Sequence, residues 1–371
     1  MSLARRLRQP SLIFGLFCTL GLCAASLYNL WFIDSLGGTA FGRSQTVWMV
    51  AGLVAGGIVA GMDMGFLRRI SGTVYQALVL LLVAVLLFGR EINHSRRWIE
   101  LGPMNLQPSE FMKLAVVMVI ADYFDRQRAQ EPWTLRRLGR PLLLLGLPFV
   151  LINREPDLGT SLCVALIAGS MILYEGVSRR TLLMALFVVV LGVPLAWRSG
   201  VIHSYQKGRV QAWMALDEAA LQERRRAPAS QPEQALWAVG SGRWLGRDTD
   251  DARRSVLRHL PFLYTDFALA SWAELFGLLG TMGLFGLFAG LLWWALHLAD
   301  CAAERFDALV AVGVAALVFW QFFINAGMVI GLLPVVGMTL PLMSYGGSSV
   351  LTVLLGVGLL VNIALRRRAR G

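Results

Sequence analysis

The sequence predicts an all-α polytopic membrane protein with about ten transmembrane helices and a large extracytoplasmic loop between helices 7 and 8. Hydrophobic residues make up 56% of the 371-residue chain, and its mean hydropathy is +0.61. Charged residues make up only 15%, against roughly 25% in soluble domains. A soluble protein would have to bury apolar runs such as 74–88 and 310–323 without any bilayer. We therefore interpret the chain as an integral membrane protein.

A transmembrane helix needs about 20 predominantly apolar residues. The candidate spans, in order, are 11–33, 45–64, 73–89, 110–125, 141–153, 158–175, 180–197, 266–297, 307–332 and 345–365. The first has no small-residue cleavage site, so we expect a retained helix and not a removed signal peptide. Two others, 110–125 and 141–153, are short or interrupted by polar residues. Irregular backbone at membrane depth is tolerated only inside a bundle or cavity, so we expect both at the centre of the protein.

The basic residues predict the orientation. Ten spans place both termini on one side, where the segments carry 17 basic residues against 5 in the short loops opposite. This asymmetry predicts cytoplasmic termini. The long loop, 198–265, carries 11 more basic residues, but loops beyond about 60 residues escape the charge rule.

The long loop contains two recognisable stretches. Residues 217–234 predict a surface helix followed by a linker, and 242–254 predict a Gly- and Asp-rich loop. The net charge of +11 is not interleaved with aromatic residues as on a nucleic-acid-binding surface. No internal repeat is visible, so we treat 1–371 as one membrane domain.

Ionisable residues inside or at the edge of a membrane are functional candidates, and four polar clusters map to the outer side. In the first, Glu110 and Lys113 are one helical turn apart and can pair. The pair either orders the bundle or places Lys113 beside a cavity for an anionic ligand. Arg96, Arg97 and Gln107 would then lie just above, and three cations around one site suit a diphosphate.

The second cluster lies in the outer turn 153–161. Asp157, after Pro156, predicts the N-cap of the following helix. Arg154 and Glu155 accompany it in the same tight turn. A cap alone does not require these two neighbours, so a functional role stays open beside the structural one.

The third cluster lies within 333–351. Pro334, Gly337 and Pro341 predict a rigid re-entrant loop, and 344–349 opens the last helix. Backbone N–H groups at a Gly-rich helix start can bind an anion. The alternative is a Gly/Ser turn that lets helices pack closely.

The fourth cluster is "YTDFALASWAELFG". Asp266 stands at the mouth of an apolar segment, where it is either a helix cap or a reactive group. Glu274 lies two helical turns further on and needs a partner or a cavity. Cysteines and histidines lack CxxC and HExxH spacing, and no nucleotide motif is present. We therefore expect no nucleotide or organic cofactor; a divalent cation, Mg²⁺ or Mn²⁺, remains open.

Together, "RRWIELGPMNLQPSEFMKLA", "EPDLGTS", "YTDFALASWAELFGLLG" and "INAGMVIGLLPVVGMTLPLMSYGGSSVL" resemble the SEDS family, which includes RodA, FtsW and SpoVE. "GMV" followed by "LLPVVG" is more similar to the RodA branch. The resemblance implies a peptidoglycan glycosyltransferase that polymerises lipid II, carried on undecaprenyl diphosphate, for cell elongation and shape. It implies a site facing outward from the bacterial cytoplasmic membrane. It also implies a class B penicillin-binding protein (a transpeptidase) and other elongation-complex proteins as partners.

The resemblance assigns the site residues. Asp266, in the TDF motif, is implied as the catalytic residue, and we expect it to act as general base on the acceptor sugar hydroxyl. The expected substrate-binding residues are Arg97, Trp98, Gln107, Glu110, Lys113, Glu155, Asp157, Arg209, Glu274, Ser344, Gly346, Gly347 and Ser348. The chain departs from the family at Phe262, Tyr264 and Leu275, where Glu, His and a second acid are usual. A lipid-precursor flippase and a non-catalytic scaffold that activates a transpeptidase remain alternatives.

Overall fold

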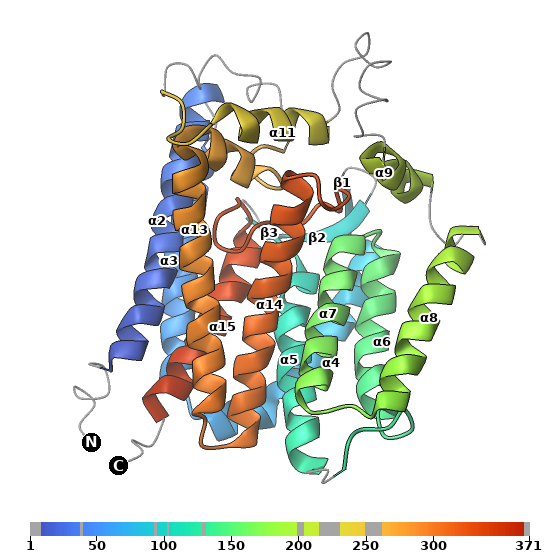
Figure 1. Ribbon diagram of the computed structural model, residues 1–371. Coiled ribbons are helices and arrows are strands. Elements are labelled where there is room, and N and C mark those ends of the chain that lie inside the picture. Colours follow the sequence, from blue (N-terminus) through green and yellow to red (C-terminus); the bar gives the residue numbers. More distant parts are fainter. Residues whose placement is uncertain are drawn as a thin grey trace.

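The protein is a bundle of long helices that run roughly along one axis (Figure 1). The computed structural model describes residues 9–37, 40–92, 95–101, 104–127, 131–198, 204–214, 231–248 and 262–366. Within them, the helices matching the ten predicted spans are α2 (Pro10–Gly37), α3 (Phe41–Gly61), α4 (Met64–Phe88), α5 (Pro108–Gln127), α6 (Gly139–Arg154), α7 (Leu158–Tyr174), α8 (Arg179–Arg198), α13 (Ala268–Asp300), α14 (Arg305–Val329) and α15 (Gly347–Arg366). The start of α2 and the end of α15 lie at the same end of the bundle (Figure 1).

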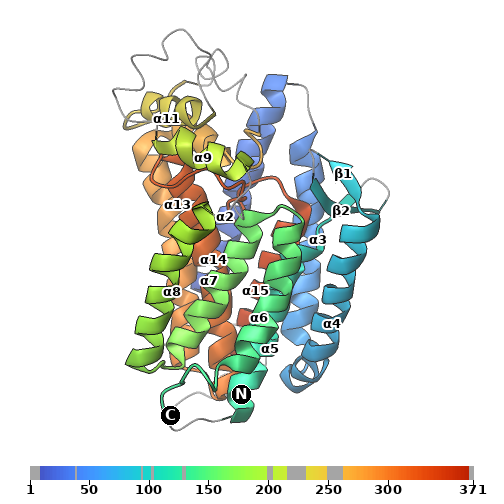
Figure 2. The same cartoon turned by 90° about the vertical axis from the view of Figure 1, so that its right-hand side faces the viewer.

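The composition of the helices confirms a multi-pass membrane protein. Among the described residues, six helices are long and apolar enough to cross a membrane: α2, α3, α4, α13, α14 and α15. α14 and α15 are mostly buried, so they form the centre around which the others pack. α8 stands apart from the bundle (Figures 1 and 2), and Thr181 is its one buried residue among those whose side chains are described.

The two short spans differ in position. α5 is central, as expected, and buries both its polar and its apolar residues. α6 is not central: it buries only Pro141, Pro148 and Ile152, while Leu143 and Val150 are exposed. The physical reason is that α5 is interrupted by charged residues, which need a protein interior. α6 is interrupted only by Gly and Pro, which lipid-facing helices tolerate.

A small antiparallel sheet, which the sequence did not predict, joins α4 to α5. Its strands are β1 (Arg90–Ile92), β2 (Ser95–Leu101) and β3 (Met104–Leu106), in the order β1-β2-β3. Trp98 pairs with Arg90, and Ile99 pairs with Leu106. Strands this short are difficult to recognise from period-2 alternation. The sheet carries Arg97 and Trp98 over the start of α5.

Two further helices, α9 (Ser204–Met214) and α11 (Gln231–Ser241), lie across the end of the bundle opposite the start of α2 (Figures 1 and 2). The Trp213 indole donates to the Gly331 carbonyl at 2.8 Å, which ties α9 to the loop after α14. Most of the predicted surface helix and linker, 217–230, lies outside the described residues. Residues 231–234, expected as linker, instead begin α11. Residues 242–248 form turns and loop as predicted, and 249–254 lie outside the described residues.

Small residues bring α3 and α15 into direct contact. A Cβ on Gly56 would lie 2.6 Å from the Leu354 carbonyl oxygen, and one on Gly358 would lie 2.4 Å from the Gly56 oxygen. Such close approach is the usual role of small residues between membrane helices. Asn362 adds hydrogen bonds to the Val59 and Met62 carbonyls, both at 2.8 Å. These contacts hold the middle and the end of α15 against α3.

Candidate active site

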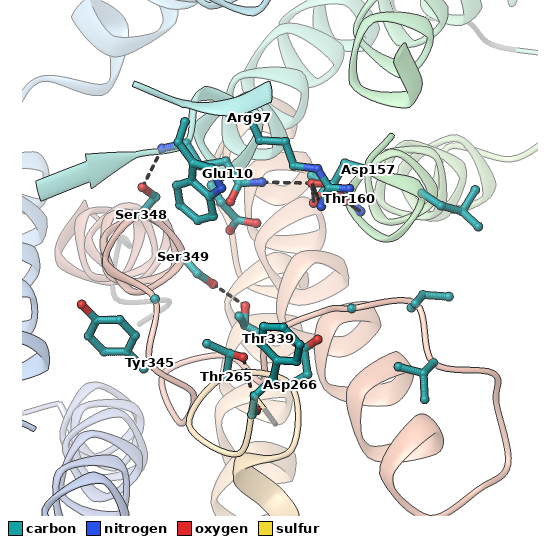
Figure 3. Close-up of a pocket in the computed structure, with 18 of the residues that line it drawn as sticks. Arg97, Glu110, Asp157, Thr160, Thr265, Asp266, Thr339, Tyr345, Ser348 and Ser349 are labelled. Carbon is teal, nitrogen blue, oxygen red and sulfur yellow. Dashed lines mark hydrogen bonds and ion pairs between the residues drawn. The ribbon is translucent and has the colours of Figure 1, made fainter. Parts of the chain in front are cut away.

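A cavity of about 540 Å³ opens among β2, the starts of α5, α7 and α15, helix α9, the turn before α13, and the segment 334–339 (Figure 3). This size is typical of small-molecule sites. The predicted site residues that line it are Arg97, Trp98, Gln107, Glu110, Asp157, Arg209, Asp266, Gly346, Gly347 and Ser348. Lys113, Glu155, Glu274 and Ser344 do not line it. The four sequence clusters thus converge on one cavity, with these four residues placed behind its walls or away from it.

Asp266 is not the cap of α13. The N-cap position belongs to Phe267, and no side-chain hydrogen bond caps this helix. The Asp266 carbonyl accepts a hydrogen bond from Asn325 Nδ2 at 2.9 Å, and the same amide donates to the Met338 carbonyl at 2.6 Å. These bonds attach the backbone of the acid to both α14 and the loop after it. The carboxylate is left to face the cavity (Figure 3).

Arg209 stands beside Asp266. A Cβ on Gly337 would lie 3.5 Å from Arg209 Nη1 and 3.5 Å from Asp266 Oδ2, so this glycine lies next to both the cation and the acid. Burial raises the pKa of the Asp266 carboxyl to about 6, while the charge of Arg209 and a hydrogen bond from Thr265 act to lower it. The acid is therefore mostly ionised at neutral pH, and Arg209 is the main group that keeps it so.

Asp157 combines the two roles left open by the sequence. As N-cap of α7 it accepts hydrogen bonds from the Thr160 backbone N–H and hydroxyl, both at 3.0 Å. Its Oδ2 also accepts from Gln107 Nε2 at 3.0 Å and lies 3.6 Å from Arg97 Nη1. Figure 3 shows this group on one wall of the cavity, across from Asp266. The cap thus positions a polar network and not only a helix.

Arg97 is held in place by the same turn. Its Nε donates to the Glu155 carbonyl at 2.9 Å, and its Nη2 donates to the Pro156 carbonyl. A guanidinium has five N–H donors, so donors remain for a ligand. The Glu155 side chain itself is fully buried, and its carboxyl oxygens have no hydrogen-bond partner among the described residues. Burial and the negative charge of Asp157 raise the pKa of Glu155 to about 8, so Glu155 is largely neutral.

Glu110 and Lys113 form the predicted ion pair, with Nζ 2.7 Å from Oε2. Lys113 is almost completely buried and Glu110 lines the cavity. The expectation that Lys113 itself faces a ligand therefore does not match the geometry. Because Glu110 lines the cavity and Lys113 does not, the lysine affects a ligand only by partly neutralising the charge of Glu110.

The start of α15 forms a further wall. Gly346, Gly347 and Ser348 line the cavity, and Ser348 Oγ accepts the Gln107 backbone N–H at 2.9 Å. A Cβ on Gly347 would lie 2.1 Å from the Trp48 ring, so only glycine fits there. The N-terminus of a 20-residue helix carries partial positive charge and free N–H groups. This wall therefore favours an anion.

Ser344 serves the loop and not the cavity. Its hydroxyl accepts the Leu340 backbone N–H at 2.8 Å, and its carbonyl accepts from Gln45 Nε2 at 2.9 Å. These bonds fold the re-entrant loop against α3. The loop therefore presents the glycines that follow it at the cavity wall.

Glu274 lies away from the cavity. It is buried, and its Oε1 lies 3.4 Å from Arg247 Nη1, while its carbonyl accepts the Arg247 backbone N–H at 2.9 Å. The partner that the sequence required for Glu274 is therefore Arg247, in the segment that follows α11. Leu275, at the position of the family's second acid, is buried and packs in a small apolar cluster with Phe32 and Phe276.

The chain is similar to known proteins over most of its length. The FtsW/RodA/SpoVE family, described as cell cycle proteins, matches residues 8–369. The chain belongs to this family. It is 36% identical over 301 residues to the peptidoglycan glycosyltransferase MrdB of Escherichia coli K12, covering 79% of this chain and 77% of that protein. It is 34% identical over 334 residues to a probable peptidoglycan glycosyltransferase FtsW of Hydrogenovibrio crunogenus, covering 87% and 82%.

Solved structures agree with this family membership. A chain from a study titled "Structural coordination of polymerization and crosslinking by a peptidoglycan synthase complex" matches with a TM-score of 0.79 and 28% identity, covering 96% of this chain and 98% of that one. The rod shape determining protein RodA of Thermus thermophilus matches with a TM-score of 0.70 and 27% identity, covering 95% and 96%. The family's helical fold and multi-pass membrane character, expected from the sequence, are confirmed.

Sequence reasoning missed an aromatic group at the cavity. Tyr264, where the family has His, stacks on Phe41 with ring centroids 3.9 Å apart. Tyr345 contacts both rings, and its backbone N–H donates to the Tyr264 carbonyl at 2.7 Å. Tyr264 and Tyr345 line the cavity. Only the unusual residue at position 264 signalled this group, because its members come from three distant parts of the chain.

The described residues offer limited support for a metal ion. They contain no group of three or more His, Cys, Asp or Glu side chains arranged to hold one, and the four cysteines are unpaired. Of the cavity carboxylates, Glu110 is paired with Lys113 and Asp157 with Arg97. A divalent cation fits only if the substrate supplies most of its ligands, as Mg²⁺ bound to phosphates commonly allows.

Proposed function

We propose that this chain is a peptidoglycan glycosyltransferase that joins the disaccharide units of lipid II into glycan strands during cell elongation. Its membership in the family and its similarity to MrdB support the activity. The observation that carries the mechanism is the Asp266 carboxylate: it faces a polar cavity beside Arg209, and it caps no helix.

Asp266 acts as the general base. It removes the proton from the acceptor sugar hydroxyl as the hydroxyl oxygen attacks the anomeric carbon of the donor. A base works best when its pKa lies near the working pH, and the pKa of about 6 for Asp266 meets that condition. One base suffices, because a diphosphate can leave without receiving a proton. The displacement inverts the anomeric centre.

The cations and the helix start bind the leaving group. Arg97 and Arg209 line the cavity together with the N-terminus of α15, so three positive groups face the cavity beside the carboxylates of Asp157 and Glu110. Preorganised donors of this kind stabilise charge that develops on a leaving group. Arginine also matches phosphate oxygens with two parallel N–H bonds. A lipid diphosphate is the substrate group that this wall suits best.

A divalent cation, if used, would be held by substrate diphosphate oxygens together with Asp266 or Asp157. It would neutralise charge on the diphosphate. Asp266 still takes the proton, Arg209 still maintains its ionised form, and Arg97 remains fixed by the turn 155–157.

The location supports an outward-facing site in the bacterial cytoplasmic membrane. The cavity lies toward the end of the bundle that carries the sheet, α9 and α11, opposite the start of α2 and the end of α15 (Figure 1). The charge asymmetry of the sequence favours cytoplasmic termini, which puts the cavity outside. Lipid tails would stay in the bilayer while the sugars project into the cavity. A class B penicillin-binding transpeptidase is the proposed partner, supported by the likeness to a chain of a peptidoglycan synthase complex.

The test is polymerisation of labelled lipid II by the purified protein, with and without a candidate transpeptidase, compared with Asp266→Ala. We expect glycan strands from the natural chain and none above background from the variant. Equal polymerisation by both would refute the role of Asp266. Lipid translocation in vesicles without polymerisation would favour a flippase. Transpeptidase activation without polymerisation would favour a scaffold.

A further inference from the structure

α13 is broken at Gly277, whose backbone has φ 62 and ψ −161. The part before the break, 268–276, connects to the turn that carries Asp266. The part after it, 278–300, is about 34 Å long at 1.5 Å per residue, which matches a hydrocarbon core of about 30 Å. Asp300 and Glu304 mark its far end with exposed charges. Residue 278 therefore lies at the opposite boundary of the hydrocarbon core.

An outer-loop segment, 242–248, is fastened to this break; we name it the clasp. The Arg243 and Trp244 carbonyls accept the backbone N–H groups of Leu278 (2.8 Å) and Leu279 (3.1 Å). These are the first N–H groups of the spanning part, which otherwise lack partners within the helix. A Cβ on Gly277 would lie 2.4 Å from the Gly246 nitrogen, so the two backbones touch directly.

An ion pair between buried Glu274 and the exposed Arg247 completes the attachment. Glu274 meets Arg247 of the clasp at 3.4 Å, on the cavity side of the break. The clasp is thus held on both sides of Gly277. It therefore sits at the height of the outer boundary of the membrane, whichever way its side chains point.

The clasp exposes its two largest apolar side chains. Trp244 is 68% exposed and Leu245 is 78% exposed, and Leu278, Leu279 and Met282 beside them are also exposed. The last three begin the lipid-facing surface of α13, so the apolar surface of the clasp continues the surface that meets the bilayer. Adjacent exposed apolar residues of this size are unfavourable in water.

We propose that the clasp inserts Trp244 and Leu245 into the headgroup region of the outer leaflet, so that its partner is the lipid surface. Tryptophan concentrates at this depth in membrane proteins, and Arg243, which is exposed next to it, can contact lipid phosphates. The membrane then fixes the height of the break. Because 268–276 extends from the break to the turn 262–267, the height of Asp266 above the bilayer is fixed as well.

The test measures immersion depth in phospholipid vesicles that contain this chain alone. Single cysteines for a spin label replace Leu245, Asp248 or Met282 in a background whose four natural cysteines are alanine. Met282→Cys is the lipid-exposed reference, and Asp248→Cys is the aqueous reference within the same clasp. We expect a ratio of oxygen to nickel-complex collisions at position 245 that is several-fold above position 248 and approaches position 282.

A ratio at 245 equal to that at 248 would overturn the proposal. If adding a transpeptidase then reduced the collisions of both reagents with the label at 245, the partner that covers Trp244 and Leu245 would be a protein. Should the cysteine-free background fail to fold, a benzophenone amino acid at 245 or 248 of the natural chain gives a second measurement. Crosslinking to labelled phospholipid at 245 and not at 248 is expected; equal crosslinking contradicts it. Neither measurement depends on polymerisation, so each stands apart from the proposed function.

Discussion

Replacing Asp266 by asparagine should greatly slow polymerisation and at the same time stabilise the fold. Asparagine keeps the size of the side chain and can accept the Thr265 hydrogen bond, but it has no ionised form. The carboxyl faces the cavity where burial raises its pKa, and Arg209 only partly offsets that effect. The natural chain therefore keeps an ionised group that its own fold disfavours.

The size of the stabilisation follows from the pKa. A group with a raised pKa in the folded state stabilises the fold below its unfolded pKa, and this contribution is lost as the pH rises through the folded value. Here the pKa is 3.8 ordinarily and about 6 in the fold. Each pKa unit corresponds to about 1.4 kcal/mol. At pH 7 the ionised Asp266 thus costs about 3 kcal/mol relative to a neutral side chain of the same shape.

Two measurements check this reasoning. Thermal unfolding in detergent at pH 7 should give Asp266→Asn a higher midpoint than the natural chain, and the difference should shrink as the pH falls from 6 toward 4. Polymerisation should fall by roughly 10² to 10⁴, the usual contribution of a general base. Glu131→Gln, an exposed carboxylate paired with exposed Arg137, is the matched control and should change neither quantity measurably. If Asp266→Asn had a lower unfolding midpoint and kept its activity, both the cost of burying the ionised carboxylate and the role of Asp266 as general base would be refuted.

Other predictions concern the surroundings of Asp266. The rate of polymerisation should fall on the acidic side with an apparent pKa near 6, since only the ionised base is active; a flat pH–rate profile from 5 to 7 would contradict this. Gly337→Ala should lower activity, because a side chain is strained at a φ of +76 and any backbone adjustment would shift the contacts with Arg209 and Asp266; lipid II polymerisation checks it. Lys113→Met should destabilise the protein by about 3–5 kcal/mol by leaving Glu110 without its partner, and Lys113→Met combined with Glu110→Gln should recover much of that in thermal unfolding.

The positions of most helices were predictable from the sequence, because apolar length is a local property that the bilayer requires. The ten predicted spans agree with ten helices, and Asp157 caps α7 as its place before an apolar run predicted. The expected central placement of α6 was wrong, because its short length and its Gly and Pro residues show only that a helix is irregular. The packing of the whole bundle decides which neighbouring helices cover α6. The small sheet was missed because its strands are too short for alternation to stand out.

The site, like the fold, was predictable from the sequence only in part. Sequence patterns selected Asp266, Asp157 and Arg97 as chemically significant, and the cavity brings these three together. Sequence also grouped Glu274 with them, since an acid in an apolar helix needs a partner. Only the fold shows that this partner is Arg247 of the clasp, which meets Glu274 just before the break in α13.

By itself the sequence determined that the chain crosses a membrane many times and carries acids and cations toward one face, because hydropathy and charge act residue by residue. Only the tertiary structure decided which of those groups meet. Arg209 lies on α9 and Asp266 in the turn before α13, and a Cβ on Gly337 would lie 3.5 Å from both side chains. Such contacts join residues far apart in the chain and depend on backbone geometry that no local pattern encodes. Burial raises the pKa of Asp266, and the charge of Arg209, with the Thr265 hydrogen bond, acts against that rise.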